Sequence, residues 1–555
     1  MEEQNSKFDF FICHTSEDKE KIAKPIYEGL NQLKIKCWLD IFEIDYGDEI
    51  IEKIQEGINL SQFSLIILSH NWFNNSWASK ELFSLLSREI RKKKTIVIPL
   101  IVDDERTILE NIPFLEGKRY IKHQSVEGTI QELYEFIKRK KEFEPKDICF
   151  ISSEYPPNVI GGLGVHVDEL TNSLEKNGLN INIVLPKSYS NYVPSNEKLT
   201  LLPLAKVEAT YNNPISWLNF ANFAVNKVCS LETLPDVIHC HDWVTILAGI
   251  ICKIKLQIPL IYHLHLPNKR PFCSSIENLG LVCSDLVTVN SDYIKEEVLS
   301  RNLNINNIKV IRNGVNTKLF KPNDDSNEED YILYVGRLVH QKGVDTLIRA
   351  FWYVSQKFPN TKLKIVGIGD LEEYLKRLCI NLMIKDKVSF EGLKRGEDLS
   401  SYYQKCKMVV VPSIYEPFGM TAIEALACKK PVIATNLMGL KENIINEKTG
   451  FLFEKDDYLG LAQWIMLLLY NEEKRHELGQ NGYEYIIKKG FDWDIISKEF
   501  ISIYKEISTN KISKCDNESA QKFIEQIKRL AEEQAEYLPK DKEKLFNDLF
   551  KVFYS

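Results

Sequence analysis

Three features are missing from the 555-residue sequence. Its twelve cysteines form no Cys-x-x-Cys pair and no regular spacing, which argues against a disulfide framework or a cysteine-rich zinc site. There is no run of about 18 apolar residues, and no basic stretch followed by an apolar one near residue 1, so we expect neither a membrane span nor a secretion signal. Positive charge is not in excess, with 71 Lys plus Arg against 78 Asp plus Glu. This charge balance gives no reason to expect nucleic acid as the main partner. The cysteine pattern, together with the expected absence of a membrane span and a secretion signal, predicts a cytoplasmic protein.

The composition that remains is that of a globular protein, with 44% hydrophobic and 27% charged residues. At roughly 150 residues per domain, the length favours three to four folding units. Strand-like apolar runs at 8–13, 147–157 and 331–336 each open an alternation of strands and helices. This alternation predicts an α/β fold in which helices cover parallel sheets.

The predicted boundaries follow from these starting points and from polar stretches between them. The domains are an α/β unit at 1–143, two further α/β units at 144–322 and 323–508, and a tail at 509–555 whose apolar spacing predicts two helices broken at Pro539.

Small polar residues follow the first strand at His14, Thr15 and Ser16. The carboxyl end of a strand is where open α/β sheets bind ligands, although these residues could also serve as an ordinary helix cap. The motifs at 8–19, 37–40 and 65–82 resemble, in order, those of the TIR domain, in particular the bacterial kind. The resemblance covers about residues 6–140 and implies a flavodoxin-like domain.

Two residues of the third motif, Trp77 and Glu81, are four positions apart and would share one face of a helix. The resemblance implies that Glu81 is the catalytic residue that cleaves the nicotinamide–ribose bond of NAD, in a pocket with His14 and Trp77. A carboxylate could stabilise the oxocarbenium character that develops on the ribose. The alternative is that Glu81 is a solvated helix residue of an assembly scaffold. The segment 40–48 resembles the self-association segment of TIR domains, which predicts a homo-oligomer.

Two cations stand at a strand end in the third unit. Arg337 and Lys342 lie between the strand starting at Tyr331 and a helix starting near Val344. Together they could neutralise a diphosphate, although isolated surface charges are more common. A glycine-rich turn around Gly162 would likewise permit close approach of a ligand, or be only a tight turn.

A pair of glutamates, Glu416 and Glu424, flanks the start of a further helix near Thr421. Amides at this helix start could face an anion. The alternative is a capping box, because Thr421 and Glu424 have the T-x-x-E spacing in which the carboxylate bonds the backbone of the first turn.

Taken in order, five motifs of the larger part of the chain resemble those of retaining glycosyltransferases of the GT-B fold, the group 1 type related to glycogen and sucrose synthases. The resemblance covers about residues 146–507. The motifs are at 154–170, 236–243, 311–322, 334–351 and 416–435.

This resemblance implies that a nucleotide-diphospho-sugar donor binds between the two Rossmann-like units. The residues that would bind the donor are Gly162, Arg337, Lys342, Gly419, Met420, Thr421 and Glu424. The catalytic candidates are Glu416, which would orient the donor sugar, and His265, which would contact it. Asp242 and Trp243 would face the acceptor, whose identity the sequence does not indicate.

No metal and no resident cofactor are expected, because the two cations would stabilise the diphosphate. The His-x-His pairs at 239–241 and 263–265 are interpreted as strand-end residues rather than as metal ligands. Val159 stands where glycogen synthases carry a lysine. Sugar transfer in the broader sense therefore fits better than starch or glycogen synthesis.

Three hypotheses of function remain open. The chain could be a two-enzyme protein that transfers sugar and cleaves NAD, in defence or signalling. The TIR domain could instead be a non-enzymatic scaffold for the transferase. Alternatively, the transferase part could be a nucleotide-sugar sensor that gates a TIR enzyme in antiviral defence.

Overall fold

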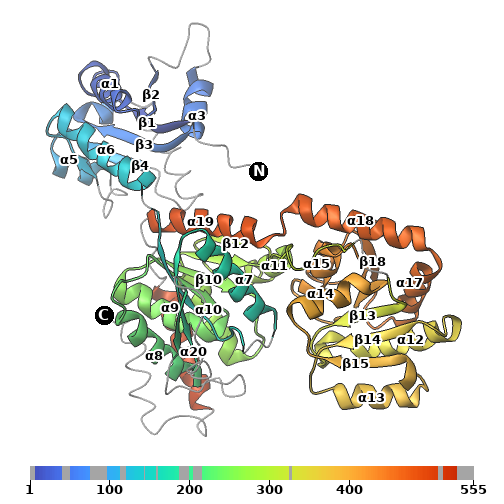
Figure 1. The fold of residues 1–555 in the computed structure, drawn as a ribbon. Coiled ribbons are helices and arrows are strands. Elements are labelled where there is room, and N and C mark those ends of the chain that lie inside the picture. Colours follow the sequence, from blue (N-terminus) through green and yellow to red (C-terminus); the bar gives the residue numbers. More distant parts are fainter. Residues whose placement is uncertain are drawn as a thin grey trace. The chain divides into compact units, whose positions relative to one another are not determined.

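The computed structural model describes residues 7–40, 50–74, 97–112, 120–142, 144–157, 161–186, 199–203, 216–323, 328–509 and 517–533. The chain forms two compact units (Figure 1). The first is Met1–Glu144 with Thr509–Lys511, and the second is Pro145–Ser508 with Ile512–Ser555. Among the described residues, the strands form three sheets in which every strand pair is parallel, as predicted.

The sheet of the first unit has the strand order β2-β1-β3-β4-β5, which is the flavodoxin-like order. Its strands are β1 (Phe8–Cys13), β2 (Cys37–Trp38), β3 (Ser61–Leu68), β4 (Val97–Ile101) and β5 (Ile121–Lys122). The helical segments are η1 (Lys19–Ala23), α1 (Lys24–Gln32), α3 (Ile50–Leu60), η2 (His70–Asn74), α5 (Glu105–Asn111) and α6 (Val126–Glu142).

Both faces of this sheet are apolar because its strands are mostly hydrophobic. Phe10 packs with α1 and α6 on one face, while its neighbour Phe11 packs on the other face with Ile58 of α3 and Ile108 of α5. Successive side chains of a strand point to opposite faces, so a strand buried on both sides has no polar alternation.

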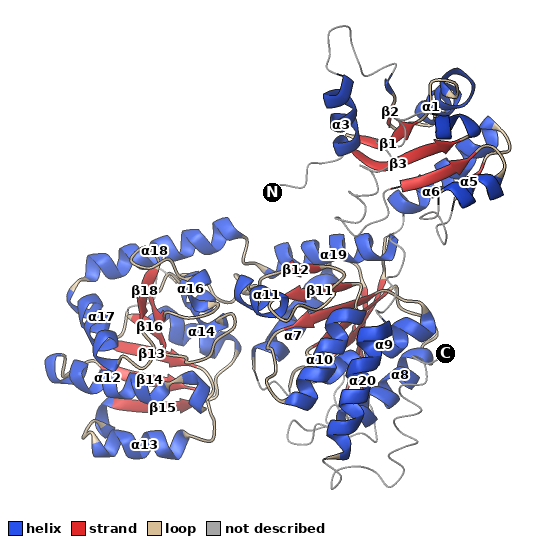
Figure 2. Ribbon diagram, turned by 180° about the vertical axis from the view of Figure 1, so that it is seen from behind, coloured by secondary structure: helices blue, strands red, loops and turns tan. Residues whose placement is uncertain are grey.

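The amino-terminal half of the second unit holds a sheet with the order β12-β11-β10-β9-β6-β7-β8. Its strands are β6 (Asp147–Ile151), β7 (Asn180–Leu185), β8 (Leu199–Pro203), β9 (Val237–His241), β10 (Leu260–Leu264), β11 (Leu286–Val289) and β12 (Ile308–Val310). Its helices are α7 (Gly162–Lys176), α8 (Ser216–Cys229), α9 (Trp243–Leu256), α10 (Pro271–Cys283) and α11 (Asp292–Leu299). Helices cover the sheet as in a Rossmann-like domain (Figure 2).

The other half of the second unit holds a sheet with the order β15-β14-β13-β16-β17-β18. Its strands are β13 (Tyr331–Val335), β14 (Lys362–Val366), β15 (Val388–Gly392), β16 (Met408–Val411), β17 (Val432–Thr435) and β18 (Gly450–Phe453). Its helical segments are η5 (His340–Lys342), α12 (Val344–Lys357), α13 (Glu372–Asn381), η6 (Lys385–Lys387), α14 (Gly396–Lys405), α15 (Met420–Ala427), α16 (Leu440–Asn443), α17 (Tyr458–Tyr470) and α18 (Glu472–Lys489).

Helix α19 (Trp493–Thr509) returns the chain to the amino-terminal half of this unit. Trp493, Phe500 and Tyr504 of α19 are buried in the core formed by β6, β7 and α7. Just before the helix, Asp492 bridges to Val315 in the segment between the two halves. Two separate stretches of chain therefore connect the two halves.

The tail contributes helix α20 (Asn517–Glu532), which was predicted from its apolar spacing. The helix packs against α10, and its buried side chains Ala520, Phe523, Ile524 and Ile527 join the core of the amino-terminal half. The second tail helix, predicted beyond Pro539, lies outside the described residues. Across the described ranges, every helix is too short or too polar to cross a membrane.

Candidate active site

A cavity of about 1140 Å³ lies between the two halves of the second unit. Loops at the carboxyl ends of the strands line it, which is the usual ligand position in such sheets. Nine residues predicted from the sequence contribute to its walls. They are Gly162, Asp242, Trp243, His265, Arg337, Lys342, Glu416, Gly419 and Met420.

The two predicted cations occupy the same wall of the cavity. Arg337 follows β13 and is exposed, whereas Lys342 ends η5 and is half-buried. The Lys342 Nζ is 2.5 Å from Glu416 Oε2, and the Ser413 hydroxyl donates to the same oxygen at 3.2 Å. The carboxylate is therefore held by a cation that a diphosphate could also attract.

Gly343 makes this position of Lys342 possible. Its φ of +59° is in the left-handed region, and a Cβ there would lie 2.1 Å from the Pro412 carbonyl oxygen. A side chain would separate the η5 turn from the loop after β16. The glycine thus brings the segment carrying Lys342 close to the segment carrying Glu416.

Helix α15 begins at Met420, within one residue of the predicted start, and Gly419 is its N-cap residue with a φ of +97°. A glycine cap has no side chain that could bond the amides of the first turn. Because Gly419 and Met420 both line the cavity, the positive end of the helix dipole is available to an anion there.

The capping box that was considered for Thr421 and Glu424 is absent. The Thr421 hydroxyl donates to the Val335 carbonyl at 3.2 Å, and the Tyr403 hydroxyl donates to Glu424 Oε2 at 2.7 Å. Burial raises the pKa of Glu424 to about 7, against the opposing effect of the Tyr403 hydrogen bond. Neither Thr421 nor Glu424 is among the residues that line the cavity.

On the opposite wall, α7 begins at Gly162 after the predicted glycine-rich turn. The Gly161 N–H donates to Glu154 Oε2 at 3.1 Å, so Glu154 holds this turn. A Cβ added to Gly162 would come within 3.6 Å of Met420 Cγ, which places the starts of α7 and α15 close together across the cavity. Glu154 was missed as a site residue, although it begins the motif that contains the turn.

Asp242 connects the ends of two strands at the cavity wall. Its Oδ1 accepts hydrogen bonds from the His265 N–H at 2.7 Å and the Leu266 N–H at 3.3 Å. Burial raises the pKa of Asp242 to about 8 despite these bonds. Trp243 begins α9 and is buried. Asp242 therefore fixes the backbone that carries His265.

Behind this wall five imidazole rings lie in one buried cluster, formed by His166, His239, His241, His263 and His265. His239 and His241 are in β9, His263 is in β10, and His265 follows β10. His241 and His265 stand at strand ends, as predicted, whereas His239 and His263 lie inside their strands. Burial lowers the pKa of each ring, which makes the cluster neutral at neutral pH.

In the first unit, His14 follows β1 and bonds Asp40. Its Nε2 is 3.2 Å from Asp40 Oδ1, and Lys19 Nζ is 2.8 Å from Oδ2. Burial would raise the pKa of Asp40, but the hydrogen bonds from His14 and Lys19 lower it to about 2. Trp77 and Glu81 lie outside the described residues, so their predicted roles stay predictions.

Asp18 forms a second polar group at the same sheet edge. The hydroxyls of Thr15 and Ser69 donate to its Oδ2 at 2.6 and 2.5 Å, and the Asn71 amide donates to Oδ1 at 3.2 Å. Asp18 precedes η1 without bonding its amides through the side chain. The Asp18 carboxylate therefore joins the ends of β1 and β3.

Comparison with known protein families assigns each part of the chain. Residues 315–485 match the glycosyl transferases group 1, and residues 160–319 match glycosyltransferase family 4. Residues 10–134 match the TIR domain. These matches agree with the predicted order of a TIR domain followed by a GT-B transferase.

Individual relatives cover the transferase part. An uncharacterized glycosyltransferase of Methanocaldococcus jannaschii is 30% identical over 385 residues, which are 64% of this chain and 97% of that protein. The solved sucrose-phosphate synthase of Thermosynechococcus elongatus has a TM-score of 0.60 at 25% identity, over 65% of this chain and 98% of its own. Anabaena Alr3699/HepE, solved in complex with UDP and glucose, has a TM-score of 0.54 at 20% identity, over 64% and 99% of the respective chains.

The fold and the glycosyltransferase matches thus extend over almost the whole second unit. The chain belongs to the glycosyl transferases of group 1, with the GT-B fold, and carries a TIR domain before its transferase part.

Proposed function

We propose that the second unit transfers a sugar, with retention of configuration, from a nucleotide-diphospho-sugar in the 1140 Å³ cavity to an acceptor hydroxyl. The observation that carries this proposal is the meeting of Arg337, Lys342 and the start of α15 on one wall of the cavity. Two cations and a helix start form a strong anion site without a metal.

In the proposed reaction, the bond between the sugar C1 and the diphosphate oxygen breaks. The electron pair stays on the diphosphate, where Arg337 and Lys342 stabilise the growing charge. The acceptor oxygen bonds to C1 on the same face, and its proton passes to the departing phosphate oxygen. Glu416 orients the donor sugar and His265 contacts it.

Lys342 has a particular role in donor binding. In the structure it pairs with Glu416, so arrival of the diphosphate offers Lys342 a second anionic partner. Glu416 is then released to accept hydrogen bonds from the donor sugar. The donor ribose is assigned to Glu424, whose carboxylate can accept further hydrogen bonds besides the one from the Tyr403 hydroxyl.

A uridine nucleotide is the first donor to test, because Anabaena Alr3699/HepE was solved with UDP and glucose. Calorimetry with UDP-, GDP- and ADP-sugars should identify one that binds, and product analysis should show whether it is consumed. Arg337→Met and Lys342→Met should each weaken binding by about 10-fold or more, since each removes a charged hydrogen bond worth about 1.5–3 kcal/mol.

Lys376→Met is the matched control, because Lys376 pairs with Glu372 and Glu373 on the surface of α13. It should bind the donor as the wild type does. Unchanged binding in both Arg337→Met and Lys342→Met would contradict the assigned donor site.

We further propose that the TIR domain cleaves NAD and releases nicotinamide, with Glu81 as the catalytic residue. The match to the TIR domain over 10–134 supports this proposal, together with the polar side chains that Asp18 and His14 place at the carboxyl ends of β1 and β3. Ligands bind at this edge in flavodoxin-like sheets.

The test is nicotinamide release from NAD by the purified full chain. Glu81→Gln should abolish release, whereas Glu110→Gln, which alters an exposed pair with Arg106, should not. Full activity in Glu81→Gln would exclude the assignment. Absence of activity in the wild type under all conditions would favour a scaffold role.

A further inference from the structure

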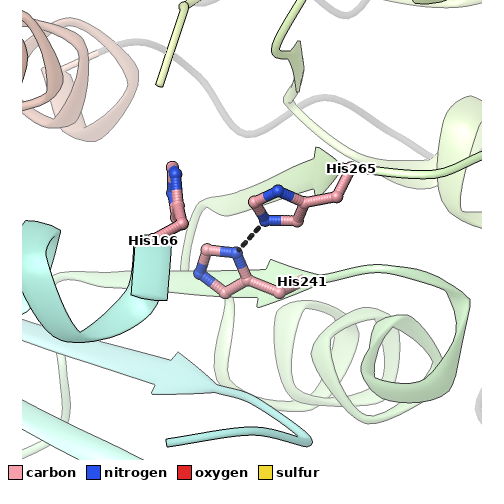
Figure 3. A group of neighbouring side chains, drawn as sticks. All are labelled: His166, His241 and His265. Carbon is pink, nitrogen blue, oxygen red and sulfur yellow. Dashed lines mark hydrogen bonds between the residues drawn. The ribbon is translucent and has the colours of Figure 1, made fainter. Parts of the chain in front are cut away.

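Three rings of the buried histidine cluster point toward one another from separate elements. His166 comes from α7, His241 ends β9 and His265 follows β10 (Figure 3). One ring nitrogen of each lies within 4.8 Å of the others. Contrary to the expectation from the sequence, we propose that His166, His241 and His265 form a binding site for one divalent transition-metal ion of the zinc class.

The hydrogen bonding of His166 leaves one nitrogen ready to act as a ligand. Its Nδ1 is 2.9 Å from Asn313 Oδ1, and because that oxygen can only accept, Nδ1 must carry the proton. The Nε2 of His166 therefore has a free lone pair, and it is buried without a hydrogen-bond partner. Metal-binding histidines commonly have such a second partner, which fixes the tautomer and orients the ring.

His241 and His265 already have nearly the required spacing. Their Nδ1 and Nε2 atoms are 3.1 Å apart. A tetrahedral ion with nitrogens at about 2.0–2.1 Å holds them about 3.3–3.4 Å from each other. Because no pair of the three exceeds 4.8 Å, closing the site needs a ring movement of at most about 1.5 Å.

The proton balance of this step needs no external base. A single proton lies between His241 Nδ1 and His265 Nε2 when both rings are neutral. Metal binding moves that proton to the outer nitrogen of its own ring. The site is thus formed by a change of tautomer.

The cavity lies next to the proposed site. His265 and Asn313 both line it, whereas His166 and His241 are buried behind them, so an ion would enter past His265 and Asn313. Three imidazole ligands leave a fourth position for water, as in open zinc sites. All-nitrogen ligand sets favour zinc, cobalt, nickel or copper over magnesium or calcium.

The binding test uses the full chain without an affinity tag, after treatment with a chelator. Titration with Zn²⁺ by calorimetry should give one ion per chain, and Co²⁺ should give the visible absorption of a tetrahedral site. His166→Gln and His265→Gln should each weaken binding by at least about 100-fold, and Asn313→Ala by about 10- to 100-fold.

Two histidines provide matched controls. His263 belongs to the cluster and also has a buried, unpartnered Nε2, but it is outside the group of three. His476 is exposed on α18. His263→Gln and His476→Gln should both bind Zn²⁺ with the wild-type affinity.

The absence of saturable binding to the wild type would overturn the proposal, as would equal binding by His166→Gln and His265→Gln. If these two variants do not fold, X-ray absorption of the zinc-loaded wild type decides, because fewer than three imidazole ligands would also overturn it. All of these readouts are independent of sugar transfer, so failure of the metal site and failure of the proposed transferase are distinguishable.

Discussion

At the scale of single residues, Glu424 carries a pH-dependent cost to stability. Its pKa is about 7 in the folded chain against an ordinary 4.5, chiefly because it is buried. Between these two values the unfolded carboxyl loses its proton while the folded one keeps it, so the fold loses stability as the pH rises. Above pH 7 the loss is complete.

We predict that Glu424→Gln unfolds like the wild type below about pH 4.5 and is more stable by about 3 kcal/mol at pH 8, at about 1.4 kcal/mol per pKa unit. Denaturant unfolding at several pH values measures the difference. Glu484→Gln, which alters only an exposed contact with Gln480, should show no such trend. If the stability advantage of Glu424→Gln over the wild type became smaller as the pH rose, the predicted direction of the pH dependence would be wrong.

Gly343 is the second residue with a clear expected effect. Gly343→Ala adds a methyl group at a φ of +59° and 2.1 Å from the Pro412 oxygen. The left-handed backbone alone costs about 1–2 kcal/mol for a residue with a Cβ, and the clash adds to this. We predict a loss of at least about 2 kcal/mol in the free energy of unfolding, measured by urea titration.

Gly161→Ala is the matched control for stability, because a Cβ at Gly161 meets no atom within 4 Å and its φ is −158°. Equal losses in the two variants would show that the effect comes from removing any glycine near the cavity rather than from this turn.

At the scale of elements, α20 stabilises the amino-terminal half of the transferase, although the helix lies outside the range 144–322 that was predicted for that half. Ile524 of α20 is fully buried against the core of this half, whereas Gln521 of the same helix is exposed to solvent. A buried, unpaired carboxylate is strongly unfavourable, so Ile524→Asp should lower the free energy of unfolding by about 3–5 kcal/mol or detach the helix.

Limited proteolysis followed by mass spectrometry distinguishes these results, because a detached α20 is cut before the rest of the unit unfolds. Gln521→Asp places the same charge on the exposed face of the helix and should change neither stability nor cleavage. A tail that is cut equally in the wild type and in Ile524→Asp would contradict the packing.

The sequence could predict those parts of the site that depend on local pattern. The run at Phe8–Cys13 forms a strand because five of its six residues are apolar, and α12 begins at the predicted Val344 because Gly343 ends the preceding turn. Arg337 and Lys342 could be placed at the cavity because both stand between a predicted strand and a predicted helix.

Features that depend on tertiary neighbours could not be predicted in this way. The T-x-x-E spacing of Thr421 and Glu424 is the same whether the carboxylate caps a helix or accepts a hydrogen bond from Tyr403, and only the fold brings Tyr403 there. His166 was missed because it joins His241 and His265 only through the pairing of β9 with β10 and the packing of α7 on that sheet.

At the scale of the whole molecule, the two proposed activities belong to separate compact units of one chain. The proposed donor site lies within the second unit, and the proposed NAD site lies within the first. We therefore predict a crossed pattern. Glu416→Gln should abolish sugar transfer and leave nicotinamide release unchanged, while Glu81→Gln should do the reverse.

Both reactions are measured on the same preparations of full-length protein, with NAD cleavage followed in the presence and absence of each sugar nucleotide. The double variant should lose both activities and keep the unfolding temperature of the single variants. A sugar nucleotide that is bound but not consumed, and that changes the rate of nicotinamide release in the wild type but not in Lys342→Met, would contradict independence. That result would identify the transferase fold as a sensor, since only a difference in donor affinity between two states of the chain can couple the cavity to the TIR domain.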